Sequence, residues 1–79
     1  MSATEVARED WGTLTPGDRI KVDWTMPWES VETSWETEFE GLRHTRSEFG
    51  HPLTYIITSD GGLSDRIVDR VTLITKEQK

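Results

Sequence analysis

The sequence has no cysteine, and none of its apolar runs approaches the length of a membrane span. Without cysteine, the chain can form neither disulfides nor thiolate metal sites, which fits a reducing compartment. A membrane-spanning helix needs about 20 consecutive apolar residues, and no segment here supplies them. The first residues also lack the basic start and apolar middle of a secretory signal. We therefore expect a cytoplasmic protein with no membrane partner.

Basic residues are scarce in the first half of the chain. Residues 1–41 carry three basic and ten acidic side chains, whereas residues 42–79 carry six basic and five acidic ones. A phosphate-binding surface needs Lys and Arg gathered on one face, so this distribution argues against nucleic acid as a direct ligand. The net charge of −6 is compatible with a basic protein partner, or with solubility alone.

A chain of 79 residues is long enough for one small domain. Residues 1–10 are polar and charged, and we expect a flexible tail there because short isolated helices are marginal in water. Residues 76–79 form a second polar tail. The domain itself is predicted to occupy residues 11–75.

Two segments, residues 19–24 and 35–41, alternate between apolar and polar side chains. This period of two is typical of half-buried strands. Gly41, at the end of the second segment, is expected to mark a bulge or sharp bend. The predicted core-facing residues are Ile20, Val22, Trp24, Trp35, Thr37 and Phe39.

The segment richest in aliphatic residues, residues 52–74, predicts a hairpin. Residues 54–58 have the β-branched and aromatic composition of a strand, and Asp60-Gly61-Gly62 supplies residues that accept the positive φ of a tight turn. An apolar run follows this turn. We predict a short 3₁₀ turn at residues 68–71 and a last strand at residues 72–75.

A long loop, residues 25–34, separates the first two predicted strands. Pro27 argues against a central strand there. Five short strands with one long early loop predict an all-β fold that curls into a small barrel, because a barrel hides the edges that a flat sheet would expose.

Three segments of the chain resemble SH3-like barrels of the Tudor and KOW type. Thr15-Pro16-Gly17-Asp18-Arg19-Ile20-Lys21-Val22 is similar to their "Gly-Asp-x-Val-x-Val" opening strand. Tyr55-Ile56-Ile57-Thr58-Ser59-Asp60-Gly61-Gly62 is similar to their "Tyr-x-Val-x-x-Asp-Gly" hairpin, and Val68-Asp69-Arg70-Val71-Thr72-Leu73-Ile74 to their closing 3₁₀ turn and final strand. The resemblance covers roughly residues 13–75.

This resemblance implies a five-stranded SH3-like barrel with a long loop between strands 1 and 2, and binding rather than catalysis. The sequence lacks the Ala-Leu-Tyr-Asp-Tyr start and the paired tryptophans of peptide-binding SH3 domains. Its single tyrosine does not supply the several aromatics of a Tudor cage. Neither ligand class is therefore carried over.

No catalytic or metal-binding constellation is visible in the sequence. His44 and His51 are seven residues apart, which matches no metal-ligand spacing, and we expect them to be exposed loop residues. Nothing pairs a nucleophile with a base. The chain is therefore predicted not to be an enzyme and to use no metal or cofactor.

All four tryptophans lie in the first half of the chain. Trp24 and Trp35 are in phase with core-facing positions, and Trp11 is expected to cover the open end of the barrel. Trp28 follows Pro27 in a loop without periodicity. Either it is an exposed residue that dominates partner binding, or the loop folds back and Trp28 plugs the barrel.

Glu36, Glu38 and Glu40 form a carboxylate row on the predicted solvent face of the second strand. The simpler interpretation is a solvated face that discourages pairing between sheet edges. The alternative is a surface that binds a basic partner or mimics nucleic-acid phosphates.

The leading hypothesis is a small non-enzymatic module that binds a protein partner, by aromatic burial at the centre and charge steering around it. The predicted partner-binding residues are Trp28, Glu29, Glu32, Trp11, Glu36, Glu38 and Glu40. Two alternatives remain. One is an acidic, phage-type inhibitor that binds a basic nucleic-acid-binding protein. The other is a structural subunit that forms a homo-oligomer.

Overall fold

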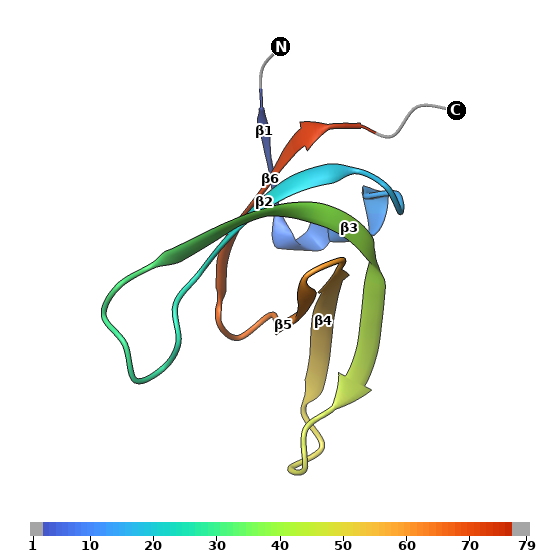
Figure 1. The fold of residues 1–79 in the computed structure, drawn as a ribbon. Helices are drawn as coiled ribbons and strands as arrows, with labels where there is room; N and C mark the ends of the chain where they lie inside the picture. The colour runs from blue at the N-terminus through green and yellow to red at the C-terminus, as the bar shows by residue number, and fades with distance from the viewer. Residues whose placement is uncertain (1–2, 77–79) are drawn as a thin grey trace.

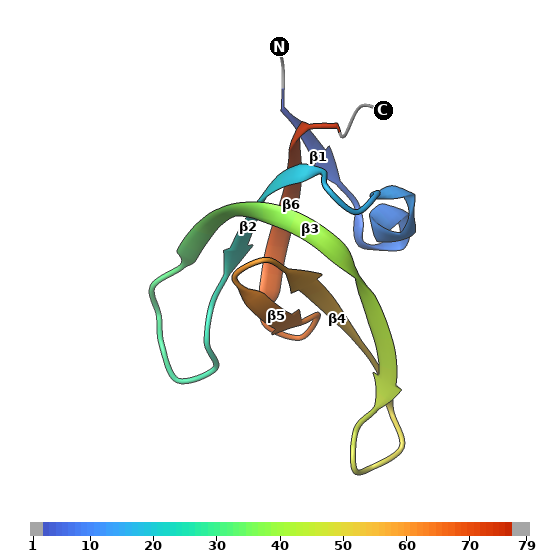
Figure 2. The same cartoon turned by 45° about the vertical axis from the view of Figure 1, so that its right-hand side comes forward.

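A computed structural model describes residues 3–76 and consists mostly of antiparallel β-sheet. The elements are β1 (Thr4–Val6), the 3₁₀ helix η1 (Arg8–Thr13), β2 (Arg19–Trp24), β3 (Thr33–Arg46), β4 (Pro52–Thr58), β5 (Gly61–Ser64) and β6 (Val68–Thr75). The strands hydrogen-bond in the order β1-β6-β2-β3-β4-β5, in a strongly curled sheet whose edges are β1 and β5 (Figures 1 and 2). The all-β prediction is confirmed, but the sheet has six strands rather than five and is not closed.

The central strand β2 has the alternation that the sequence predicts. Ile20 and Val22 are fully buried, and β2 is hydrogen-bonded to β3 on one side and to β6 on the other. Trp24 and Trp35 pack edge to face, with ring centroids 5.4 Å apart and planes at 71°. Both indoles are half-buried against the core, as expected from their phase.

The bend in β3 lies at Gly41, as the sequence predicts. β3 pairs with β2 up to Glu38 and with β4 from Phe39 onward. The register shifts between Phe39 and Gly41, which leaves Glu40 as the extra residue of a bulge. β3 runs on past the alternating segment to Arg46, because its second half forms a long hairpin with β4.

The hairpin between β4 and β5 turns through Ser59 and Asp60, and Gly61 follows with a φ of 136° that favours glycine. The predicted 3₁₀ turn at residues 68–71 is wrong. The turn lies at residues 65–67, and β6 already begins at Val68. The reason is packing, because Val71 pairs with Val22 across the sheet and must be extended to reach the core.

The prediction of a flexible tail at residues 1–10 is also wrong for its described part. Val6 of β1 pairs with Val71 of β6, and η1 then brings Trp11 onto the core. The buried apolar core consists of Trp11, Leu14, Ile20, Val22, Phe39, Ile56, Leu63 and Val71. The predicted C-terminal tail at residues 76–79 lies outside the described residues, apart from Lys76.

Lys76 fixes the end of the described chain to the segment before β2. Its Nζ donates to Asp18 Oδ2 at 3.0 Å, to Thr15 Oγ1 at 2.9 Å and to the Thr13 carbonyl at 3.1 Å. The side chain of Asp18 is fully buried, and its Oδ2 also accepts the Thr15 backbone N–H at 2.8 Å. A buried carboxylate of this kind needs such partners, because an unpaired buried charge is costly.

Candidate functional site

The β2–β3 loop, residues 25–32, projects from the curled sheet (Figures 1 and 2). The side chains of Trp28 and Val31 are its apolar tip, with exposed fractions of 76% and 70%. Glu29 follows Trp28 in the chain and is exposed too. The alternative in which the loop folds back and Trp28 plugs a barrel is therefore wrong. Exposed apolar side chains gathered at one tip are typical of interaction sites.

The base of this loop is held by hydrogen bonds to the β6 region. The backbone N–H of Thr25 donates to the Ile67 carbonyl at 3.0 Å, and its hydroxyl donates to Asp69 Oδ2 at 2.6 Å. At the other end of the loop, Ser34 Oγ donates to the buried Asp23, whose carboxylate also lies 3.8 Å from Arg70. The loop therefore starts and ends on fixed positions.

Glu32 belongs to this base rather than to the exposed tip. A hydrogen bond between its carboxyl and that of Asp69 raises the pKa of Glu32 above its ordinary value of 4.5, and the nearby charge of Asp23 acts in the same direction. Arg70 opposes them by favouring the charged form. Glu29 and Glu32 are both exposed, and Glu29 is the one that directly follows Trp28 at the tip.

Trp11 does not contribute to an exposed surface. Its side chain is only 5% exposed and packs into the core beneath η1. The Arg8 guanidinium lies 6.0 Å from the ring centroid and forms an ion pair with Asp65. The prediction that Trp11 belongs to the partner-binding surface is wrong, because η1 turns its indole inward.

Glu36, Glu38 and Glu40 are exposed along β3, as their alternation predicts. The register places Lys21 directly opposite Glu36 and Arg19 opposite Glu38. Cross-strand neighbours lie about 4.5–5.5 Å apart at Cβ, close enough for opposite charges to interact favourably. Two of the three carboxylates therefore have a basic residue as cross-strand neighbour, which makes the row a weaker mimic of phosphates than three carboxylates alone.

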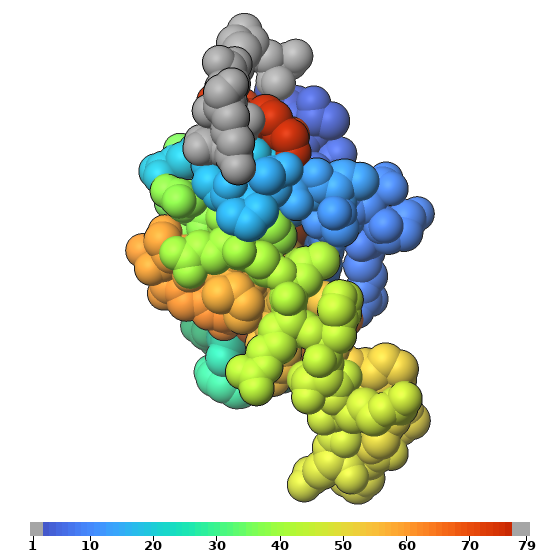
Figure 3. Space-filling model, turned by 90° about the vertical axis from the view of Figure 1, so that its right-hand side faces the viewer, coloured from blue at the N-terminus to red at the C-terminus, as the bar shows by residue number. Residues whose placement is uncertain are grey.

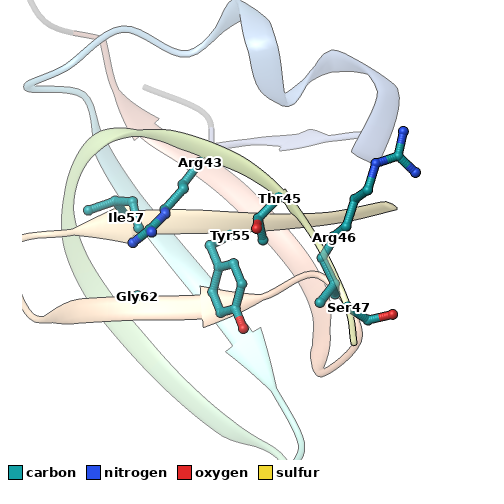
Figure 4. A pocket seen from close by; sticks show the side chains of 8 residues that line it. Arg43, Thr45, Arg46, Ser47, Tyr55, Ile57 and Gly62 are labelled. Atoms are coloured by element: carbon teal, nitrogen blue, oxygen red, sulfur yellow. The ribbon is translucent and has the colours of Figure 1, made fainter. Parts of the chain in front are cut away.

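The structure reveals an open groove that the sequence did not indicate. It lies on the outer face of β3, β4 and β5 and has a volume of about 560 Å³. The lining residues are Arg43, Thr45, Arg46, Ser47, Leu53, Tyr55, Ile57 and Gly62 (Figure 4). None of them is acidic. The groove therefore combines an apolar floor with a cationic wall.

The apolar floor arises because β4 carries apolar residues on both faces. Ile56 points into the core, whereas Leu53, Tyr55 and Ile57 occupy the alternate positions and line the groove. On β5, a Cβ at position 62 would lie 3.2 Å from Cδ1 of Ile57, so Gly62 leaves that side chain uncovered. The apolar run in β4 could have indicated from the sequence that this strand has two apolar faces. Which residues lie beside the outer face could be known only from the order of the strands in the sheet.

Arg43 and Arg46 differ in what they can offer to a ligand. Arg43 stands opposite Tyr55 in the register, and within residues 3–76 its guanidinium makes no hydrogen bond or ion pair. Arg46 Nη1 donates to the Gly50 carbonyl at 2.9 Å, and Figure 4 shows its guanidinium directed away from Tyr55. Arg43 is therefore the available cation of the groove.

A second exposed aromatic lies at the tip of the β3–β4 hairpin, which extends well beyond the body of the molecule (Figure 3). The side chain of Phe49 is 80% exposed there. It is a single apolar residue beside Glu48, and it does not line the groove. It therefore provides a control for the loss of an exposed aromatic ring.

The histidines lie on this hairpin without forming a metal site. His44 Nδ1 is 3.2 Å from Thr54 Oγ1, and His51 is exposed. Among residues 3–76, no group of three or more His, Asp or Glu side chains is arranged to hold a metal ion. Nor does this part of the chain contain a helix long and apolar enough to cross a bilayer.

Comparisons with protein-family models, with curated proteins and with solved structures find no match to this chain.

Proposed function

We propose that this chain is a small non-enzymatic module that binds a protein partner through its β2–β3 loop. The observation that carries the proposal is the exposure of Trp28, 76% of whose side chain faces solvent in an anchored loop. Burying a large aromatic side chain removes about 150–250 Å² of surface from water. Tryptophan is also one of the three residue types enriched among those that dominate binding energy.

We further propose that the curled sheet is an SH3-like barrel left open between β5 and β6. Strands β2 to β6 form one continuous ladder, in the order β6-β2-β3-β4-β5. The bulge at Gly41 divides β3 into a half that pairs with β2 and a half that pairs with β4. In small barrels, a bulge bends a strand sharply, so that the two halves of the strand belong to different sides of the barrel.

The fixed base of the loop favours recognition. Binding costs about 0.5–1.5 kcal/mol for each rotamer-rich side chain that must be ordered, and more when a whole loop is ordered. Here Thr25 and Asp69 hold one end of the loop, and Asp23 with Ser34 holds the other. Only the tip has to adapt to a partner.

Charge defines the class of partner. The loop contains two acidic residues and no basic ones, and Glu29 adjoins the exposed indole. Carboxylates around an aromatic centre attract a basic surface and accelerate encounter. We therefore propose a partner with a cation beside an apolar pocket.

The experiment is a pull-down from a nuclease-treated lysate of source cells, with tagged wild type beside Trp28→Ala and Phe49→Ala. Both variants lose an exposed ring, so Phe49→Ala controls for a general loss of surface apolarity. We expect the main retained protein to be lost with Trp28→Ala and kept with Phe49→Ala. Equal retention by both variants would contradict the proposal.

A Glu36/Glu38/Glu40→Lys variant in the same experiment distinguishes the acidic-inhibitor alternative. A partner that survives Trp28→Ala and is lost only on this charge reversal would favour that alternative. Because Lys21 and Arg19 stand opposite Glu36 and Glu38, we expect instead a partner that is kept by the charge-reversed variant and lost with Trp28→Ala. Circular dichroism of each variant verifies that the fold is unchanged.

A further inference from the structure

We propose that the partner of the β2–β3 loop is a second copy of this chain, whose β3–β4–β5 groove receives the loop tip. In this head-to-tail contact the indole of Trp28 lies against Tyr55 and Ile57, and the carboxylate of Glu29 pairs with the guanidinium of Arg43. This inference rests on the proposed function, since it uses the same loop. It adds the identity of the partner and a second binding site, the groove, which no residue of the loop lines.

The two surfaces are complementary in chemistry. The loop tip has an exposed indole, an exposed valine and a carboxylate. The groove has an apolar floor, no acidic lining residue and one arginine without a partner in residues 3–76. A guanidinium and a carboxylate form strong bidentate hydrogen bonds, and aromatic rings gain further energy from stacking.

The groove is of a suitable size. Its volume of about 560 Å³ falls within the range of about 300–1,000 Å³ typical of small-molecule pockets. Gly62 keeps Ile57 uncovered on the β5 side, which leaves room for a flat ring beside it. A side chain larger than glycine at position 62 would cover part of that floor.

The contact has to be made between molecules. No residue of the loop lines the groove, and 76% of the Trp28 side chain faces solvent within its own chain. Because the loop and the groove are different surfaces, the contact is heterologous and leaves one free loop and one free groove at the ends of every assembly. A wild-type solution therefore contains chains of increasing length rather than only dimers.

The association is expected to be weak and dependent on concentration. One loop in one groove buries less than the roughly 1,200–2,000 Å² of a stable interface. Each copy also carries a net charge of −6, which opposes assembly. A salt concentration near 0.15 M shortens the Debye length to about 8 Å, so the net repulsion is screened while the local contacts remain.

The test is sedimentation equilibrium of the purified protein over a wide concentration range, with Trp28→Ala and Arg43→Glu measured alone and mixed. Each variant has one intact surface, the groove in Trp28→Ala and the loop in Arg43→Glu. We expect each alone to stay near the monomer mass of 9.1 kDa, with the dissociation constant weakened at least about tenfold. Mixing the two should restore one contact, giving a heterodimer and nothing larger.

Phe49→Ala and Arg66→Glu are the matched controls, since both residues are exposed and outside the proposed contact. We expect both to assemble like the wild type. Self-association of the double variant Glu29→Arg/Arg43→Glu, in which every loop–groove contact has the two charges exchanged, would support the assigned ion pair directly.

Three results would overturn the inference. They are a wild type that stays monomeric at every concentration, variants that assemble as well as the wild type, and a mixture that stays monomeric although the wild type assembles. If the purified protein is monomeric while a Trp28-dependent partner is captured from lysate, this inference fails and the proposed function stands. If neither self-association nor capture depends on Trp28, both fail.

Discussion

At the scale of single residues, the four tryptophans show how one residue type takes opposite roles in a small chain. Trp11 is 5% exposed and belongs to the core. Trp28 is 76% exposed and is not among the described residues that form the core or pack against it. Trp24 and Trp35 lie between these extremes and pack on each other. The periodic pattern placed Trp24 and Trp35, but it could not place the two tryptophans that lie outside strands.

The first prediction contrasts two substitutions of the same kind. Trp11→Ala should cost about 3–5 kcal/mol of unfolding free energy, because it empties part of the core, while Trp28→Ala should change it by less than about 0.5 kcal/mol. Urea denaturation followed by circular dichroism measures both. A large loss of stability in Trp28→Ala would mean that the indole is part of the core.

The second prediction concerns the contact of Lys76 with Asp18. Lys76→Met leaves the buried Asp18 carboxylate with fewer donors, so we expect a loss of about 1–3 kcal/mol of unfolding free energy. The Lys76 side chain is itself half-exposed, which keeps the effect below that of a fully buried pair. Arg66→Met, an exposed turn substitution, should be nearly neutral in the same urea titration. Equal effects of the two would contradict this role of Lys76.

At the scale of elements, the β2–β3 loop combines a fixed base with an exposed tip. The base brings together the acidic side chains of Asp23, Glu32 and Asp69, with Arg70 alongside. Asp23 is out of phase with the core-facing residues of β2 and is nevertheless buried, because Ser34 and Arg70 approach it from the neighbouring strands. Alternation along one strand cannot reveal such cross-strand cover.

The third prediction follows from the raised pKa of Glu32. A carboxyl whose folded pKa is raised stabilises the fold below its ordinary value of 4.5, and this contribution is lost as the pH rises through the folded pKa. Glu32→Gln should therefore match the wild type in acid and become the more stable protein as the pH approaches neutrality. The urea midpoints of the two proteins across this pH range measure the difference. A difference that does not change with pH would contradict the Glu32–Asp69 contact.

The fourth prediction concerns the β4–β5 hairpin. Gly61→Ala should destabilise the protein by about 1–3 kcal/mol, because a φ of 136° is strained for any residue with a Cβ. Gly12→Ala is the matched control, since a Cβ there meets nothing within 4 Å and its φ is not in the strained region. Thermal unfolding of the two variants provides the comparison. Equal midpoints would show that the turn tolerates the side chain.

At the scale of the whole molecule, local patterns in the sequence were enough for the all-β class, the two alternating strands, the bulge at Gly41 and the early loop. They were not enough for β1 or for the start of β6. β1 has only three residues, Thr4–Val6, and its pairing depends on the free edge of β6. Such an edge exists only once the sheet has formed, so no local sequence pattern predicts it.

The candidate site was predictable to the same degree. The exposed Trp28 and Glu29 were named because they interrupt a periodic pattern in an acidic loop. The groove could not be predicted from the sequence, because its lining residues come from three strands. Arg43, for example, is 12 positions away from Tyr55 in the sequence. The Glu36-Glu38-Glu40 row was located correctly, but the cations across from it became apparent only with the register of β2 and β3.

The measurement that addresses the central claim most directly is the solvent exposure of each indole N–H, by NMR relaxation with a soluble paramagnetic agent at low protein concentration. We predict strong relaxation of the Trp28 indole, and protection of those of Trp11 and Trp24, whose Nε1 atoms are buried. Raising the protein concentration should then protect Trp28 while leaving Trp11 unchanged. A Trp28 indole as protected as that of Trp11 in dilute solution would place it in the core and contradict its role in recognition.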